Sequence, residues 1–550
     1  MQTTLQKVLR WAIVPAILGG LYHLIPIFSN WFPLTSTDHQ DLYNQIRVLI
    51  YYGLILMWLT GAYLWHKKDM GKTGLIGFII MICGELLAAV WYFSSGWKGF
   101  EWWNSLSLIL SCWGVLLFGT AIMKAGRFPG LFIVVWMIGR IMGCSGLSAQ
   151  WAGRHFMMLI GMIGCGIFFW IKSNPKHSPL QKNKPFKDSR FISLDLLRGL
   201  IMMIMAIDHA SLFIRRTHPF EMWNTLVPDY FGNSGAFLTR FVTHLCAPGF
   251  FLLMGVGMIL LADSRRRKGW SPGQIMRHLA FRGVLIICLE KLIVNPLLFG
   301  GLAFIKFGVL YALGGAMLVG VLFLRVNSFG LLISGLIGIL ATQVLPQTVA
   351  TLGLYNQPVL YLLAVPQLLA TWSNLYPVLP WLSITLLGMA LGKELLKDSK
   401  KAYNKILVFG LISLVLFPIV RWTGGYGNFQ PIAGNSWIDF FNVVKYPPSL
   451  VFTLMTLGVN CLLLVLFERF QAWLGLLKYP LLVFGKTALF FYLSHWFIYS
   501  TIGSVFYLVK ANLLYLYLGW ALGLLMLYPI CHLYLEFKRR TIMNSVWRFI

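Results

Sequence analysis

Charged residues are scarce in this sequence. Only 11% of the 550 residues are Asp, Glu, Lys or Arg, while 58% are hydrophobic. Soluble domains carry about 25% charged residues, so an ordinary soluble domain is excluded. Apolar runs of about 20 residues recur along the chain, each long enough to cross roughly 30 Å of hydrocarbon as a helix. Because these runs are continuous and not alternating, the composition predicts an all-α polytopic membrane protein and not a barrel.

Acidic residues are the rarer charged class, at 17 against 45 Lys and Arg, so the formal net charge is +28. In a soluble protein this excess would suggest nucleic-acid binding. Here the Lys and Arg lie mostly in short loops between apolar runs, where the positive-inside rule places them. We therefore expect no nucleic-acid partner. We expect a bacterial inner (plasma) membrane location, membrane lipids as neighbours, and both termini in the cytoplasm.

Motifs for metal, disulfide and nucleotide chemistry are absent. The eight cysteines are scattered without a CxxC pair, which is typical of small core residues. The sequence contains no GxxxxGK[ST] loop, no HExxH pair and no Cys/His spacing of a metal site. We expect no bound metal ion and no ATP-driven mechanism.

The apolar runs predict about 16 transmembrane helices, whose first and last residues are defined to within a few positions. Six precede residue 172, at roughly 9–28, 46–65, 75–94, 104–122, 129–147 and 156–171. Ten follow, at roughly 193–213, 238–262, 281–299, 303–324, 329–345, 376–392, 405–420, 449–467, 481–506 and 512–535.

The stretch KSNPKHSPLQKNKPFKDSR is rich in Pro, Lys, Ser and Asn and lacks apolar periodicity, which is typical of a linker. It predicts a six-helix accessory unit (1–172) of unnamed role, a basic cytoplasmic linker (173–190) and a ten-helix domain (191–550). The outward loops 346–375 and 421–447 are long and aromatic, which suits an external binding surface or lid.

Ionisable residues lie inside one predicted span, LDLLRGLIMMIMAIDHASLF (194–213). Arg198 and His209 are close to three helical turns apart, so they share a face and are separated by about 16 Å. Asp208 is rotated by about 100° from His209 and should face a neighbouring helix. Such residues are costly in lipid unless they face protein or water, which makes them functional candidates. The alternative is a hydrogen bond between helices or a place in the outer headgroup zone.

The next span, beginning LTRFVTHLCAPGFFLLMG (238–255), carries Arg240 and His244 on one face. The chain enters this span from outside, so both residues should lie at the depth of His209. A histidine suits general-base chemistry, and an adjacent carboxylate such as Asp208 can orient it. The alternatives are a snorkelling arginine and a hydrogen-bonded core histidine.

Four further residues are weaker candidates. Lys445, in VVKYPPSLVF, lies at the outer mouth of a span, and His495, in FGKTALFFYLSHWFIYS, lies within one; either could bind substrate. Glu290 and Lys291 lie mid-span and suggest a buried ion pair or a cavity lining.

On the cytoplasmic side, a basic run follows one span. It could set topology and bind lipid headgroups, or it could clamp the phosphates of a cytosolic ligand. Its members are Arg265, Arg266, Arg267 and Lys268.

Five segments carry a family resemblance: SLDLLRG…DH, RFVTHLCAPGFFLLMGVG, PVLPWLSITLLGMALGK, VVKYPPSLVFTLMTLG and FGKTALFFYLSHWFIYS. In this order they resemble bacterial membrane proteins related to heparan-α-glucosaminide N-acetyltransferase. The spacing Arg198-x10-His209 also resembles the signature of the acyltransferase-3 proteins. Both groups belong to a transmembrane acyltransferase superfamily with a ten-helix core. The resemblance covers roughly residues 190–540 and does not reach the first six spans.

The resemblance implies that cytosolic acetyl-CoA, or another acyl-CoA, donates an acyl group to an amine or hydroxyl of an extracytoplasmic sugar or glycolipid. Arg198 and the basic run 265–268 would hold CoA phosphates. His209, with Asp208, would deprotonate the acceptor or carry the acyl group transiently. Arg240 and His244 would position the acceptor or stabilise the oxyanion.

One departure from the family leaves the catalytic histidine open. The heparan enzyme has asparagine where this chain has His209, and its essential histidine comes slightly later, where His218 is the candidate here. The order of preference is His209, His218, His244. Two other classes also stay open, namely a transporter or flippase of a lipid or sugar conjugate, which needs no thioester, and a non-enzymatic scaffold. The oligomeric state is not indicated.

Overall fold

The chain divides into two compact units in the computed structural model. They are Met1–Lys184 with Arg540–Ile542, and Pro185–Arg539 with Met543–Ile550. The structure describes residues 18, 40–66, 69–93, 101–124, 191–225, 227–230, 232–295, 298, 305–354, 357–368, 372–505 and 512–540.

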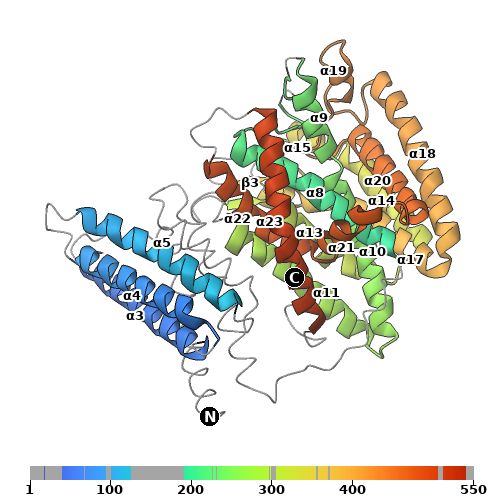
Figure 1. Ribbon diagram of the computed structural model, residues 1–550. Coiled ribbons are helices and arrows are strands. Elements are labelled where there is room, and N and C mark those ends of the chain that lie inside the picture. The colour runs from blue at the N-terminus through green and yellow to red at the C-terminus, as the bar shows by residue number, and fades with distance from the viewer. Residues whose placement is uncertain are drawn as a thin grey trace. The chain divides into compact units, whose positions relative to one another are not determined.

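The first unit contains three described helices, α3 (Gln40–His66), α4 (Gly71–Phe93) and α5 (Glu101–Lys124), drawn in blue in Figure 1. They correspond to the predicted spans 46–65, 75–94 and 104–122. Apart from residue 18, the predicted spans 9–28, 129–147 and 156–171 lie outside the described residues. Helices α4 and α5 touch through glycine, since a Cβ at Gly114 would lie 2.6 Å from the Met81 Cα. Small residues at such contacts are typical of membrane helices.

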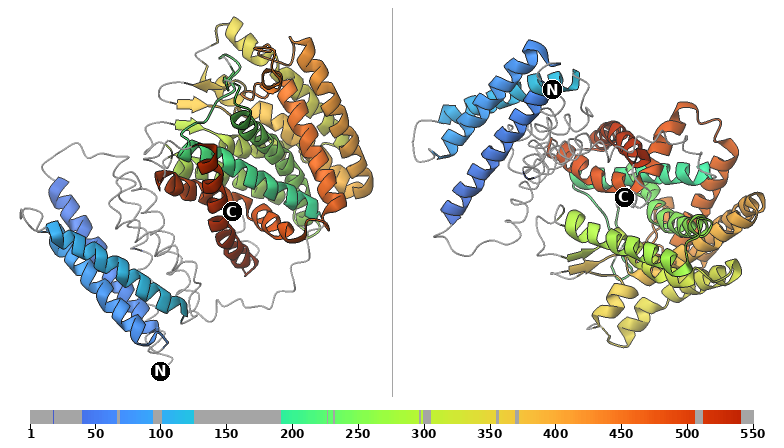
Figure 2. Two further views of the ribbon diagram at one scale, coloured as in Figure 1. Left: turned by 45° about the horizontal axis from the view of Figure 1, so that its top comes forward. Right: turned by 90° about the horizontal axis from the view of Figure 1, so that it is seen from below.

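The second unit is a bundle of helices (Figures 1 and 2). The longer ones are α8 (Ile192–Ile214), α10 (Cys246–Arg266), α11 (Pro272–Leu289), α13 (Val309–Gly320), α14 (Ser328–Thr342), α17 (Val378–Lys397), α18 (Ser399–Thr423), α20 (Leu450–Phe470), α22 (Ala488–Val505) and α23 (Leu513–Arg540). The shorter ones are α9 (Ser234–Thr243), α15 (Leu345–Thr351), α16 (Pro358–Leu363), α19 (Trp437–Phe441) and α21 (Lys478–Lys486).

The described residues include seven helices long and apolar enough to span a membrane, or up to nine if each of two bent pairs counts as one span. The predicted total of about 16 is therefore not confirmed, although a helical membrane protein is. Part of the difference lies in short elements: the segment predicted as 303–324 contains a helix, α13, of only 12 residues.

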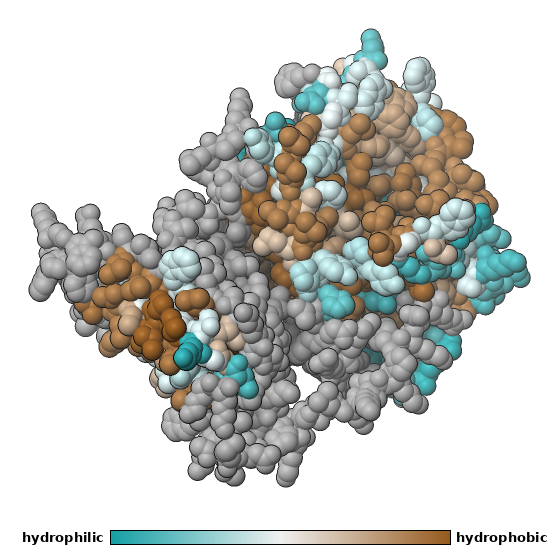
Figure 3. Space-filling model, viewed as in Figure 1, coloured by the Kyte–Doolittle hydropathy of each residue, from teal (hydrophilic) through white to brown (hydrophobic). Residues whose placement is uncertain are grey.

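The surface of the second unit matches a lipid environment. Helix α18 exposes a row of large apolar side chains, and hydrophobic residues cover much of the face seen in Figure 3. The row consists of Val408, Ile412, Val415 and Ile419. Its members are three or four residues apart and so lie along one side of the helix.

A small sheet interrupts the helical pattern. Strands β1 (Ile305–Phe307), β2 (Gln367–Leu368) and β3 (Trp372–Asn374) lie in the order β1-β3-β2, with β1 parallel and β2 antiparallel to β3 (Figure 2). A separate bridge joins Met222 to Tyr446. Strands β2 and β3 lie in the predicted outward loop 346–375, whereas β1 lies at the start of the predicted span 303–324 and replaces its first turn with extended chain.

One predicted span is broken, and another is interrupted by a turn. The segment 481–506 forms α21 and α22, and the segment that contains them is bent by 94°. The break is at Thr487, whose φ of −118° and ψ of 27° leave the helical region. The segment 238–262 forms α9 and α10, with a turn at His244 and Leu245, yet runs on as one candidate span, Ser234–Arg266.

Glycines bring helix backbones together at several places in this unit, among them α8 with α21 and α10 with α17. A Cβ at Gly199 of α8 would lie 1.9 Å from the Leu481 carbonyl oxygen, and one at Gly485 of α21 would lie 1.9 Å from the Asp195 carbonyl oxygen. Between α10 and α17, a Cβ at Gly255 would lie 2.1 Å from the Thr385 carbonyl oxygen. Side chains cannot enter such contacts unless the backbones separate.

We expect Gly255→Val to lower the thermal unfolding midpoint in detergent, because overpacking a tight contact costs about 1–3 kcal/mol. Gly257→Val is the matched control on the same helix, since no atom lies within 4 Å of a Cβ built there. Equal midpoints for the two variants would show that α10 and α17 do not need this contact.

Candidate active site

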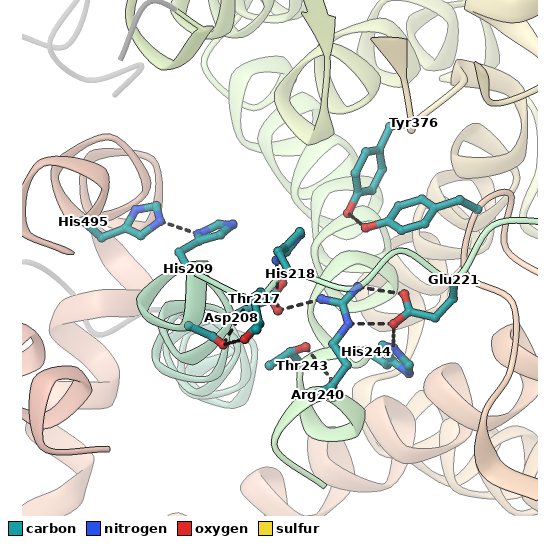
Figure 4. A network of polar contacts seen from close by, with 12 residues as sticks. Asp208, His209, Thr217, His218, Glu221, Arg240, Thr243, His244, Tyr376 and His495 are labelled. Atoms are coloured by element: carbon teal, nitrogen blue, oxygen red, sulfur yellow. Dashed lines mark hydrogen bonds and ion pairs between the residues drawn. The ribbon is translucent and has the colours of Figure 1, made fainter. Parts of the chain in front are cut away.

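A buried ion network joins the end of α8 to α9. The Arg240 guanidinium donates from Nη1 to Asp208 Oδ1 at 2.6 Å, and from Nε and Nη2 to the Glu221 carboxylate at 2.8 and 2.7 Å. Figure 4 shows Arg240 held between the two carboxylates. Glu221 is fully buried and Arg240 is 4% exposed, so water does not screen these charge-assisted bonds.

Two histidines border this network. His218 Nδ1 lies 3.5 Å from Asp208 Oδ1, and His244 Nε2 lies 3.4 Å from Glu221 Oε1 (Figure 4). Neither ring nitrogen makes a hydrogen bond within the described part of the chain. Burial lowers the pKa of the His218 imidazole to about 4, against the opposing effect of the Asp208 carboxylate. His218 is therefore neutral near pH 7.

Glu221 stays charged in this setting. Burial alone would raise the pKa of its carboxyl, but the charge and hydrogen bonds of Arg240 outweigh burial and hold that pKa below its usual range. The main chain around Glu221 is also fixed, since its carbonyl oxygen accepts from Lys445 N and Tyr446 N at 3.0 Å each. The carboxylate thus has a fixed position and a fixed charge.

A histidine pair lies on the other side of α8. His209 Nδ1 is 2.6 Å from His495 Nε2, and the Trp496 ring stacks on His209 with centroids 4.0 Å apart. His495 Nδ1 lies 3.2 Å from the Phe491 carbonyl oxygen, which can only accept, so this nitrogen carries the proton. His495 Nε2 is then the acceptor and His209 Nδ1 the donor. This assignment leaves a lone pair on His209 Nε2.

Asp208 and His209 thus face different neighbours. Asp208 contacts Arg240 of α9, and His209 contacts His495 of α22. The expectation that Asp208 orients His209 is wrong, because a rotation of about 100° between consecutive helical residues sends them to different helices. The partner that holds His209 is His495, a residue that the sequence suggests for substrate binding.

Glu290 and Lys291 do not pair with each other. Glu290 accepts from the backbone N–H groups of Gly308 and, at 2.7 Å, Tyr311, and so caps the start of α13. Lys291 donates to the Lys306 carbonyl oxygen at 2.7 Å and lies over the Phe307 ring. Both residues build the support of β1, which explains their presence in an apolar segment.

Three residues of this region were not predicted from the sequence: Glu221, Tyr376 and Tyr446. The hydroxyl groups of Tyr446 and Tyr376 share a hydrogen bond of 3.3 Å. The Tyr446 carbonyl oxygen accepts a hydrogen bond from Trp223 N at 2.9 Å. The available signal was the acidic Glu221 between two spans, at the same predicted depth as Arg240. Lys445 lies beside this group with only 4% of its side chain exposed.

The residues predicted to hold CoA phosphates lie apart from this network. Arg198 donates to Asp195 Oδ1 at 2.9 Å and to the Gly485 carbonyl oxygen at 3.3 Å. Arg282 of α11 lies within electrostatic reach of Arg198, and its Nε has no hydrogen-bond partner among the described residues. Arg198 faces the end of α21 and His209 faces α22, so both project toward the broken segment.

The basic run itself is partly committed to local contacts. Arg267 pairs with Asp263 at 2.9 Å, and the Arg265 guanidinium lies 4.6 Å from the centre of the Trp270 ring. Arg266, which lies between them in the sequence, has no polar side-chain partner among the residues that the structure describes.

Residues 190–423 match a family model, heparan-alpha-glucosaminide N-acetyltransferase, catalytic. The matched range contains the ion network and His209 and ends before Lys445 and His495. No curated protein matches the chain. Within the described residues, no group of three or more His, Cys, Asp or Glu side chains could hold a metal ion.

Proposed function

We propose a reaction for this protein on the premise that it is a membrane acyltransferase related to heparan-alpha-glucosaminide N-acetyltransferase. The donor is cytosolic acetyl-CoA or another acyl-CoA. The acceptor is an amine or hydroxyl of an extracytoplasmic sugar or glycolipid. The observation that carries this proposal is the His209–His495 pair, which presents an unprotonated His209 Nε2 inside the membrane domain.

In this reaction His209 is the general base. Its Nε2 removes the proton from the acceptor amine or hydroxyl as the acceptor atom attacks the thioester carbonyl carbon. The new C–N or C–O bond forms, the C–S bond breaks, and the CoA thiolate takes the proton back from the His209 imidazolium. His495 accepts the Nδ1 hydrogen throughout, which fixes the ring and stabilises its transient charge.

His218 is the alternative base. It lies beside Asp208, and its neutral ring has an unpartnered Nδ1. It lacks the second histidine that sets the tautomer of His209. We therefore rank His209 first and His218 second, and we assign His244 to packing against Glu221. In this scheme Arg240 positions Asp208, because the hydrogen bonds of its guanidinium to described residues go to the two carboxylates.

The donor is proposed to enter at the other end of α8. Arg198 and Arg282 bring two guanidinium groups together there, and guanidinium suits phosphate recognition. Arg198 and His209 are separated by about 16 Å along the helix. The extended pantetheine arm of CoA can cover this distance. The basic run 265–268 would extend the same phosphate site.

Binding of acetyl-CoA to the purified protein tests the donor site. We expect Arg198→Ala and Arg282→Ala each to weaken binding by about tenfold in calorimetry, since a charge-assisted hydrogen bond contributes about 1.5–3 kcal/mol. Lys400→Ala removes an exposed charge from α18 and should bind normally. Folded wild-type protein that binds none of several acyl-CoAs would remove the basis for an acyl-CoA reaction and favour a transporter.

A further inference from the structure

Two lysines near the ion network interact electrostatically with Asp208 but form no ion pair with it or with any other described carboxylate. Lys306 belongs to β1, and Lys445 lies in the segment before α20. The Lys445 ammonium lies 5.1 Å from the centre of the Tyr446 ring. Among the described residues, neither ammonium has a hydrogen-bond or ion-pair partner. The charges of both lysines act on His218.

The charge balance of the site is positive. Arg240, Lys291, Lys306 and Lys445 supply four positive charges, and Asp208, Glu221 and Glu290 supply three negative ones. Asp208 and Glu221 bond to Arg240, and Glu290 accepts from the backbone at the start of α13, so among the described residues no carboxylate bonds to the Lys306 or Lys445 ammonium. Burial lowers the pKa of the Lys306 ammonium, as expected for a cation that lacks full compensation. A buried charge without a partner costs free energy, which an anionic ligand would offset.

Both lysines are held in place by their main chains. The Lys306 carbonyl oxygen accepts from Lys291 Nζ at 2.7 Å and from Asn295 Nδ2 at 2.8 Å, and Lys306 pairs with Ser373 in the sheet. Lys445 donates its backbone N–H to Glu221. The small sheet and the Glu221 segment therefore fix the main chain at both lysines.

We infer that Lys306 and Lys445 bind an anionic group, a carboxylate or a phosphate, that the acceptor sugar carries near its reacting amine or hydroxyl. This inference rests on the proposed function and narrows its acceptor to an acidic sugar or a sugar phosphate. Ammonium N–H groups form charge-assisted hydrogen bonds to such oxygens. Among the described residues, the bonds of Asp208 and Glu221 go to Arg240, and neither carboxylate bonds to the lysines.

Binding to the full-length protein in detergent tests the inference with four probes: glucosamine, glucosamine 6-phosphate, muramic acid (a carboxylate-bearing amino sugar) and inorganic phosphate. We expect at least one anionic amino sugar to bind roughly tenfold tighter than glucosamine. A preference for the phosphate-bearing or the carboxylate-bearing sugar identifies the anion. In Lys306→Met/Lys445→Met the advantage should fall to about threefold or less.

Lys400→Met is the matched control, because it removes an exposed lysine of α18 and should leave the preference unchanged. Lys306→Gln changes a half-buried position and should by itself reduce the preference for anionic sugars. This single variant keeps the test valid if the double variant does not fold. Equal binding of neutral and anionic sugars, or an undiminished preference in the folded variants, overturns the inference. If inorganic phosphate binds as tightly as glucosamine 6-phosphate, the sugar does not contribute to binding. This result overturns the inference that the anion belongs to the acceptor sugar.

The readout is binding, so it separates this inference from the proposed function. Anion-dependent sugar binding without any acyl transfer would contradict the reaction and leave the lysine site standing. Acyl transfer to neutral and anionic sugars with equal KM would contradict the lysine site and leave the reaction standing.

Discussion

Replacing His209 with alanine should abolish acyl transfer while the protein stays folded and still binds acyl-CoA. Loss of a general base costs about 100- to 10,000-fold in rate, and we expect the effect in kcat. The physical reason is the lone pair on His209 Nε2, which no other described side chain of α8 or α22 replaces. The measurement is single-turnover transfer from radiolabelled acetyl-CoA, with donor binding followed separately.

His495 provides the control for this interpretation. His495→Phe removes the acceptor of the His209 Nδ1 hydrogen and should lower kcat strongly. His495→Gln offers an amide oxygen to the same hydrogen and should restore part of the rate, which a purely structural role would not predict. Turnover like that of the wild type in His209→Ala, together with loss of turnover in His218→Asn, would move the base to His218.

Replacing Arg240 with methionine should destabilise the protein by about 3–5 kcal/mol, because breaking a buried ion pair leaves an uncompensated charge. Asp208 and Glu221 would then both lie buried without their guanidinium, and Glu221 is fully buried. Unfolding in detergent, followed by denaturant titration, measures the loss.

The matched control is Arg267→Met, which breaks an exposed pair with Asp263 on α10. Exposed pairs contribute little, so its unfolding midpoint should stay near that of the wild type. A loss in Arg240→Met no larger than in Arg267→Met would mean that the network does not hold α8 and α9 together.

The sequence predicted individual helices better than their partners. The span 194–213 corresponds to α8, Ile192–Ile214, because a continuous apolar run marks a membrane helix in any context. The rotation of Asp208 toward a neighbour also follows from helical geometry alone. The contact between His209 and His495 could not be read in this way, since it joins residues 286 positions apart.

Other features leave no sequence signal that a hydropathy reading can use. The hydrophobic pattern continues through Thr487, where the segment bends, and strands of two or three residues are too short to show a period of two. Glu221 and Lys306 resemble ordinary charges of connecting segments. They belong to the site because the sheet and the Met222–Tyr446 bridge bring distant segments together.

The glycine contact between α8 and α21 bears on how an acyl group could cross the hydrophobic layer. Two helices whose backbones touch at Gly199 and Gly485 cannot slide by a turn, because side chains would then meet the facing backbone. Alternating-access carriers depend on one bundle rocking against another. In the proposed reaction these two helices keep their relative positions, and the acyl group moves at the end of the flexible pantetheine arm of its own CoA. The conformational change is then in the substrate and not in the helix bundle.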